Sequence, residues 1–216
     1  MNFPKFSPFC IAFLPVLLLC PKSALSQSLF LNDGESGTAF VAGAQFGEWG
    51  SSYGGSAGYS IRGRIDLRVA FAVMTGNGSG TGFGLTIEGH PIRNSRDQPF
   101  GLSLGLSAET DSYRLSGTGR EESTLAPSVF GGVSYFIPAG EGVWILPMYE
   151  FRWIGRFLAS KAGRESLRED LESTSLHTIG GSVVVEGGGK IRYFLSPSVA
   201  GSSEGWYLNV EIGILF

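Results

Sequence analysis

Residues 206–216 read WYLNVEIGILF and alternate strictly between apolar and largely polar positions. Successive side chains of a β-strand point to opposite faces, so this segment predicts a strand with one apolar face. At eleven residues it also has about the length of a tilted strand that crosses a bilayer. The apolar face consists of the even positions, which are Trp206, Leu208, Val210, Ile212, Ile214 and Phe216.

The same alternation returns along the rest of the chain. In residues 100–111, for example, Leu102 and Leu104 flank the polar Ser103. Pro147 interrupts another such segment and predicts a bulge or a local break in the strand ladder. Together these patterns predict an all-β fold. The other segments that read as strands are 38–49, 59–73, 83–91, 126–137, 143–157, 176–187 and 190–196.

The N-terminus has the layout of a secretory signal peptide. The basic Lys5 precedes an apolar run of 12 residues at 9–20, which is too short to span a bilayer as a helix. Small residues at 24–26 then offer a cleavage site. We therefore divide the chain into a cleaved signal peptide, 1–26, and one mature domain, 27–216.

Composition narrows the classes of function. The chain is 43% hydrophobic and only 16% charged, yet no long apolar run follows the signal. Its two cysteines, Cys10 and Cys20, both fall in the signal peptide, so we expect no disulfide in the mature chain. Loss of Lys5 and Lys22 leaves 14 basic against 19 acidic residues, a net charge of −5. Nucleic-acid binding needs a basic face, so we do not expect it.

These features resemble bacterial outer-membrane β-barrel proteins of the small OmpA- and OmpX-like class, without indicating a subfamily. In that class the last strand commonly alternates in this way and ends in Phe, as this chain does at Phe216. The resemblance implies a closed, antiparallel, up-and-down transmembrane barrel in the outer membrane, surrounded by lipid. It also implies that Phe216 and its alternating apolar partners form the signal that the barrel assembly machinery recognises. The alternative is an edge strand of a soluble β-sandwich.

The connections predict the number of strands. A barrel whose end lies in the periplasm alternates long outer loops with short inner turns. Counting back from Phe216 gives nine strands, and an even number is needed, so we assign 28–32 as a short tenth strand, with eight strands as the alternative. The outer connections would be 75–82, 112–125, 158–175 and 197–205, and the inner ones 50–58, 92–99, 138–142 and 187–189.

The polar faces of these strands carry many charges. If the apolar faces meet lipid, the charges point into a narrow barrel, where they must pair because an unpaired buried charge is costly. We expect a salt-bridge network that fills the lumen, with a constricted ion path as the alternative. The inward residues would be Arg62, Arg64, Asp66, Arg68, Glu88, Glu109, Asp111, Glu150, Arg152, Arg192 and Glu211.

The resulting prediction is a small envelope protein with a structural or surface-contact role, and not an enzyme. A narrow pore for small solutes is one alternative. A lipid-modifying hydrolase at the outer rim is another, but the Gly-x-Ser-x-Gly matches around Ser56 and Ser103 lack the strand-to-helix turn that such a nucleophile needs. Neither His90 nor His177 has a partner at metal-ligand spacing, so we expect no metal and no cofactor.

Overall fold

The computed structural model describes most of the chain after residue 33. The described ranges are 34–47, 50–76, 78–116, 121–162, 165–168, 172–188, 190–203 and 205–216. Within them no helix has the length and apolar character to cross a membrane. The predicted signal peptide, 1–26, and the proposed short strand, 28–32, lie outside the described residues.

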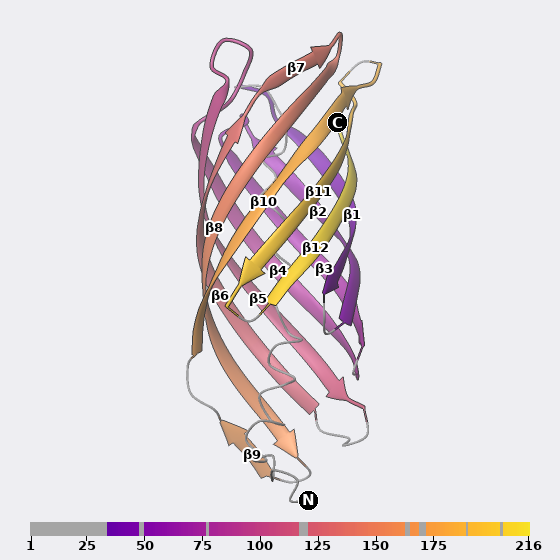
Figure 1. Ribbon diagram of the computed structural model, residues 1–216, viewed down its shortest axis with the longest axis vertical. Coiled ribbons are helices and arrows are strands. Elements are labelled where there is room, and N and C mark those ends of the chain that lie inside the picture. The colour runs from indigo at the N-terminus through magenta and orange to yellow at the C-terminus, as the bar shows by residue number, and fades with distance from the viewer. Residues whose placement is uncertain are drawn as a thin grey trace, which may run out of the picture.

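The described part of the chain is one antiparallel sheet rolled into a tall barrel (Figure 1). Its strands are β1 (Gly37–Gly47), β2 (Gly50–Ile61), β3 (Ile65–Gly76), β4 (Gly78–Ile92), β5 (Phe100–Leu115), β6 (Glu121–Tyr135), β7 (Ile137–Gly140), β8 (Val143–Ala162), β9 (Glu165–Arg168), β10 (Glu172–Glu186), β11 (Arg192–Ser202) and β12 (Gly205–Leu215).

The barrel closes between its first and last strands. β1 pairs with β12 along nine residue pairs, from Ala39 opposite Leu215 to Gly47 opposite Tyr207. Beyond this ladder, the Thr38 amide donates a hydrogen bond of 2.8 Å to the Phe216 carbonyl. β7 and β9 are short additions to β8, which itself pairs with β6 and β10. Ten strands therefore form the wall, which confirms the predicted closed up-and-down barrel.

The tenth strand is β2, which corrects the sequence prediction. Residues 50–58 were expected to be an inner connection, and 59–73 one strand. Instead β2 and β3 form a hairpin in which Ile61 pairs with Ile65. The turn has positive φ at Arg62 (52°) and at Gly63 (64°), the geometry that matches the twist of a tight hairpin. The strand escaped notice because β2, GSSYGGSAGYSI, has small residues on both faces and so little alternation in polarity.

The other connections lie at the predicted ends of the barrel, but the strands reach further into them. The outer connections expected at 75–82 and 197–205 are shorter than predicted because β3, β4, β11 and β12 continue through most of their residues. Pro147 lies where the ladder between β6 and β8 stops, after Ser134 opposite Met148, and where β7 takes over at Ile137. This is the predicted ladder break at a residue that has no N–H to donate.

The barrel wall is apolar outside and polar inside. Leu104 is 55% exposed and Ile212 is 56% exposed, and similar side chains cover the outer face of every long strand. Monomeric soluble proteins rarely expose a continuous apolar surface of this kind, whereas a membrane barrel requires it. The apolar residues of β12 that the sequence singled out lie on this outer face, from Trp206 to the exposed Phe216.

Large interior rings lie over glycines of the neighbouring strand. Phe130 of β6 pairs directly with Gly105 of β5, and Phe194 of β11 pairs in the same way with Gly213 of β12. A Cβ at Gly105 would overlap the Phe130 ring. The missing side chain thus makes room for the ring, and the ring covers backbone that a glycine leaves bare.

We expect Gly105→Ala to destabilise the barrel by about 1–3 kcal/mol, because the added methyl group displaces a packed ring. Chemical unfolding of the protein in lipid vesicles measures this change. The matched control is Gly201→Ala in β11, where an added Cβ meets no atom within 4 Å. Equal midpoints for the two variants would refute the ring-on-glycine packing.

Candidate functional site in the barrel interior

The interior collects most of the charges that the sequence assigned to it. Buried inside the barrel are Asp66 and Arg68 of β3, Glu88 of β4, and Glu150 and Arg152 of β8. Also on inward positions are the half-buried Glu109 of β5 and Glu211 of β12, and the buried Asp111 and Arg192.

Two predicted members lie elsewhere. Arg62 and Arg64 are exposed residues of the turn between β2 and β3, at the end of the barrel that contains Phe216. They were assigned to the interior because 59–73 was treated as one unbroken strand. The turn takes both arginines off the inward face.

Three ionisable residues of the described interior were missed. They are His90, Glu122 and Arg156, each 5% exposed or less. His90 and Arg156 lie at the last residues of predicted strands and continue their inward faces, since His90 follows Glu88 by two positions and Arg156 follows Arg152 by four. Glu122 lies on the inward face of β6, before the start of the predicted strand. The period of two was therefore a sufficient signal, but Glu122 fell in a segment that was read as a loop.

Arg152 makes several bonds inside the barrel. Its Nε donates to Glu150 Oε1 at 3.0 Å, and its Nη1 reaches Ser107 Oγ at 3.3 Å and Glu109 Oε1 at 3.5 Å. The guanidinium also lies 4.6 Å from the centre of the Phe130 ring. One cation thus links β8 to β5 over the intervening strand β6, by charge-assisted hydrogen bonds and a cation–π contact.

The end of the interior nearest Phe216, which we call the inner mouth, is filled by apolar side chains. Trp144, Leu146, Val184 and Phe194 form a buried cluster there. Phe136 stacks on Trp144 with ring centres 5.9 Å apart. Arg192 lies 5.8 Å from the Trp144 ring and pairs with Glu35 at 3.3 Å. Rings and an ion pair therefore lie together at this level of the interior.

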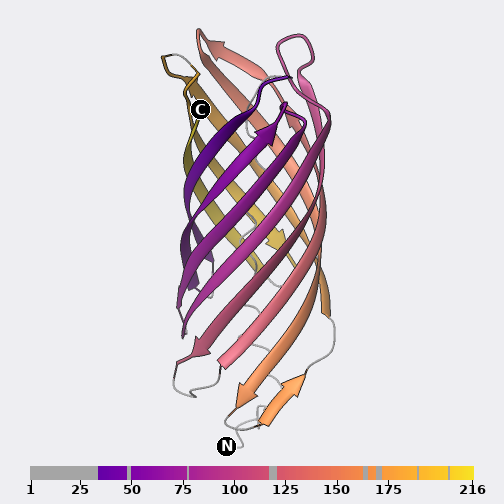
Figure 2. The ribbon, with the colours of Figure 1, turned by 180° about the vertical axis from the view of Figure 1, so that it is seen from behind.

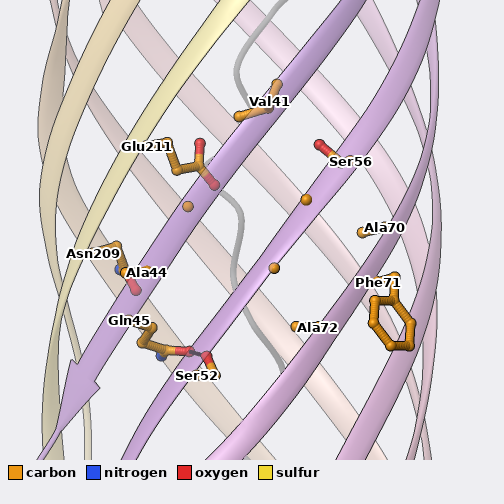
Figure 3. Close-up of a pocket in the computed structure, with 13 residues that line it drawn as sticks. Val41, Ala44, Gln45, Ser52, Ser56, Ala70, Phe71, Ala72, Asn209 and Glu211 are labelled. Carbon is orange, nitrogen blue, oxygen red and sulfur yellow. Dashed lines mark hydrogen bonds between the residues drawn. The ribbon is translucent and has the colours of Figure 1, made fainter.

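A small cavity lies against the wall formed by β1, β2 and β3, where the inward residues are small. Figure 3 shows Asn209 of β12 near Gln45 of β1 and Ser52 of β2, with Glu211 higher on the same side, toward Val41. The cavity measures about 70 Å³, room for a few water molecules. Ser52 Oγ donates to Gln45 Oε1 at 3.3 Å. A second cavity of about 20 Å³, bordered by Glu88, is large enough for about one water.

His177 and the two serines of the Gly-x-Ser-x-Gly matches lie on different strands, which are β10, β2 and β5. His177 lies on the outer face, where its Nδ1 hydrogen-bonds to the Tyr149 hydroxyl at 2.8 Å and its ring lies 5.2 Å from that of Phe151. Ser56 and Ser103 lie within strands β2 and β5, not at strand-to-helix turns. No described contact of His177 brings a serine or an acid to it.

Comparison with known proteins supports the barrel fold and does not indicate a function. No family model and no curated protein sequence matches the chain. Among solved structures, the β domain of the Bordetella autotransporter BrkA is similar with a TM-score of 0.54 at 12% identity, over 84% of this chain and 98% of that one. The translocator domain of NalP from Neisseria meningitidis gives 0.49 at 13% identity, over 97% and 96%. The N-terminal barrel of OprF from Pseudomonas aeruginosa gives 0.36 at 13% identity, over 83% and 97%. At 12% identity the likeness to the BrkA domain shows the fold alone.

Proposed function

We propose that this outer-membrane β-barrel is a plugged barrel with a structural or surface-contact role in the envelope. The observation that supports the plug most directly is the Arg152 set, whose bonds to Glu150, Ser107 and Glu109 join β8 to β5 across the lumen face of β6. A barrel of about ten strands has room for side chains and little else. Charges that are paired in that space resist displacement, because removal of one partner leaves the other buried without its counter-charge.

The inner mouth supports the same proposal by a different means. Trp144 and Phe194 are 8% and 5% exposed, and they pack with Leu146 and Val184 as a small apolar core. Water and hydrated ions avoid such a core because it offers them few hydrogen-bonding partners. An ion that entered from this side would have to displace both the rings and the Arg192–Glu35 pair.

The opposite end of the barrel supports a contact role. β5, β6, β8 and β10 have 15 to 20 residues, whereas β1, β2, β11 and β12 have 11 or 12. Figure 2 shows the long strands continuing past the short ones at the end away from Phe216. On this projecting wall the outward residues turn polar, with Ser112 and Arg114 on β5 and an exposed ion pair between Arg114 and Glu121. A polar wall beyond the apolar belt offers a surface to partners outside the membrane.

Conductance in planar lipid bilayers tests the plug. We expect no steady current through the native protein, and steady current through the double variant Trp144→Ala, Arg192→Ala, which removes the ring and the cation from the inner mouth. The matched control is Trp206→Ala, a tryptophan on the outer face that is 54% exposed. Steady current through the native protein would contradict the plug.

A narrow cation-selective pore is the second candidate, and the cavity beside Glu211 favours it. The carboxylate faces the small residues of β1 to β3, where the interior is least filled. In the same bilayer experiment this candidate predicts a native current whose preference for cations falls in Glu211→Gln. A silent native protein contradicts it.

Delivery to the membrane forms a further part of the proposal. We propose that residues 1–26 are cleaved and that β12, ending at Phe216, is what the barrel assembly machinery recognises. Deletion of Phe216 should lower the fraction of folded barrel in the membrane several-fold, as measured by the heat-dependent shift in gel mobility. Phe46→Ala, which also removes one outward ring, is the control. Normal assembly without Phe216 would exclude it as the signal.

A further inference from the structure

Three ligand-type side chains converge in the interior on two neighbouring strands. Asp66 of β3 pairs directly with Glu88 of β4, and His90 follows Glu88 on the same inward face. His90 Nε2 lies 2.9 Å from Asp66 Oδ2, and His90 Nδ1 lies 3.9 Å from Glu88 Oε1. One donor atom from each residue lies within 4.8 Å of the others. All three side chains are buried, at 5% exposure or less.

A fourth polar group beside them supports a bound ligand independently. Ser60 of β2 lies directly opposite Asp66 on the inward face and is 0% exposed. Its Oγ has no hydrogen-bond partner among the described residues. A buried hydroxyl without a partner is unfavourable, so native interiors rarely retain one. An ion beside Asp66, or a water bound to that ion, would give Ser60 Oγ its partner.

The charge balance of the interior also favours a cation. Along the inward faces of the described strands, seven carboxylates stand against four guanidinium groups. The carboxylates belong to Asp66, Glu88, Glu109, Asp111, Glu122, Glu150 and Glu211, and the guanidinium groups to Arg68, Arg152, Arg156 and Arg192. Buried charge of one sign is costly without compensation. A divalent ion would offset most of the surplus.

We propose that Asp66, Glu88 and His90 bind one divalent transition-metal ion of the zinc class, with Ser60 or a water as the fourth ligand. One imidazole and two carboxylates form a ligand set that zinc accepts in tetrahedral sites, at 2.0–2.2 Å from each atom. Tetrahedral geometry at those lengths separates two ligand atoms by about 3.3 Å. The 2.9 Å between Asp66 Oδ2 and His90 Nε2 would therefore open by a few tenths of an ångström on binding, and the Glu88 carboxylate, whose 3.9 Å contact is with Nδ1, would turn toward Nε2.

The test is metal binding by the assembled, full-length barrel after treatment with EDTA. Titration with ZnCl₂ by calorimetry should show one site per chain, and Co²⁺ should give the visible absorption of a four-coordinate site. We expect His90→Asn to weaken zinc binding on the order of 100-fold, since removal of even an outer-shell partner costs 10–100-fold. His177→Asn, which alters the histidine on the outer face, should bind as the native protein does.

The geometry of Asp66, Glu88 and His90 also allows a shared proton between these side chains. Two further measurements distinguish a bound metal ion from such a proton. Zinc X-ray absorption of the native protein should show mixed nitrogen and oxygen ligands at 2.0–2.1 Å. If His90→Asn fails to fold, Glu88→Gln takes its place in the titration. This variant keeps the side-chain shape and should also weaken zinc binding. The proposal is overturned if the native protein shows no saturable zinc binding, or if the native protein and the His90 and Glu88 variants bind zinc equally. If zinc leaves the imidazole ¹⁵N signals of His90 unchanged, then Asp66, Glu88 and His90 share a proton instead of a metal ion.

Discussion

Arg152→Ala is expected to lower the free energy of unfolding by about 3–5 kcal/mol, the cost of breaking a buried ion pair by removing one partner. The native Arg152 is 2% exposed and bonds to Glu150 and Glu109. Without it, both carboxylates remain in the interior with much less compensation. Unfolding by urea in lipid vesicles, followed by tryptophan fluorescence, measures the change.

Two comparisons make this test specific. Arg114→Ala removes an arginine of β5 whose side chain is 68% exposed. We expect little change in the free energy of unfolding, because solvent screens an exposed ion pair. The double variant Arg152→Met, Glu150→Gln replaces the central pair by neutral groups of similar size and should lose less stability than Arg152→Ala. If Arg152→Ala unfolds at the same urea concentration as the native protein, Arg152 does not hold the plug together.

Leu104→Arg is expected to cost about 2–4 kcal/mol, the cost of a cationic side chain at the bilayer midplane on the lipid face of a barrel. Leu104 is the central member of five apolar outward residues at the start of β5, from Phe100 to Ala108. Ile212→Arg should behave similarly on β12, where Ile212 is 56% exposed among apolar neighbours. The yield of folded barrel and its urea midpoint in vesicles are the measurements.

Ser112→Arg is the matched control, because Ser112 lies on the same outward face of the same strand but at its polar outer end, opposite Thr81 and Ser123. The cost of a charge falls to about 0–1 kcal/mol near the interface, so this variant should fold almost normally. Equal losses at Leu104 and Ser112 would mean that the apolar belt is not where the wall meets lipid.

The strength of local alternation decided how much could be predicted. Strands such as β5 and β12, with large apolar residues on one face only, were recognised directly. β2 was not, because its glycines, serines and alanine give both faces nearly the same polarity. That one omission also moved Arg62 and Arg64 into the interior, where the hairpin turn does not put them.

Which interior groups meet is a property of strand pairing, which acts between residues far apart in the chain. Arg152 reaches Glu109 across 43 residues, and His90 meets Asp66 across 24. No spacing along the chain shows such partners, so the sequence displayed two histidines without a metal-ligand pattern. The register of β3 against β4 is what brings a histidine and two carboxylates together.

The sequence by itself determined the two faces of the wall, because a side-chain period of two assigns each residue of a strand to lipid or lumen before any partner is known. It thereby determined the barrel class and most of the interior charges. Only the tertiary structure decided the identity of the tenth strand, the ring-on-glycine contacts and the pairing of the charges. These depend on closure of the sheet, which sets the register between strands and brings side chains from distant segments into one narrow interior.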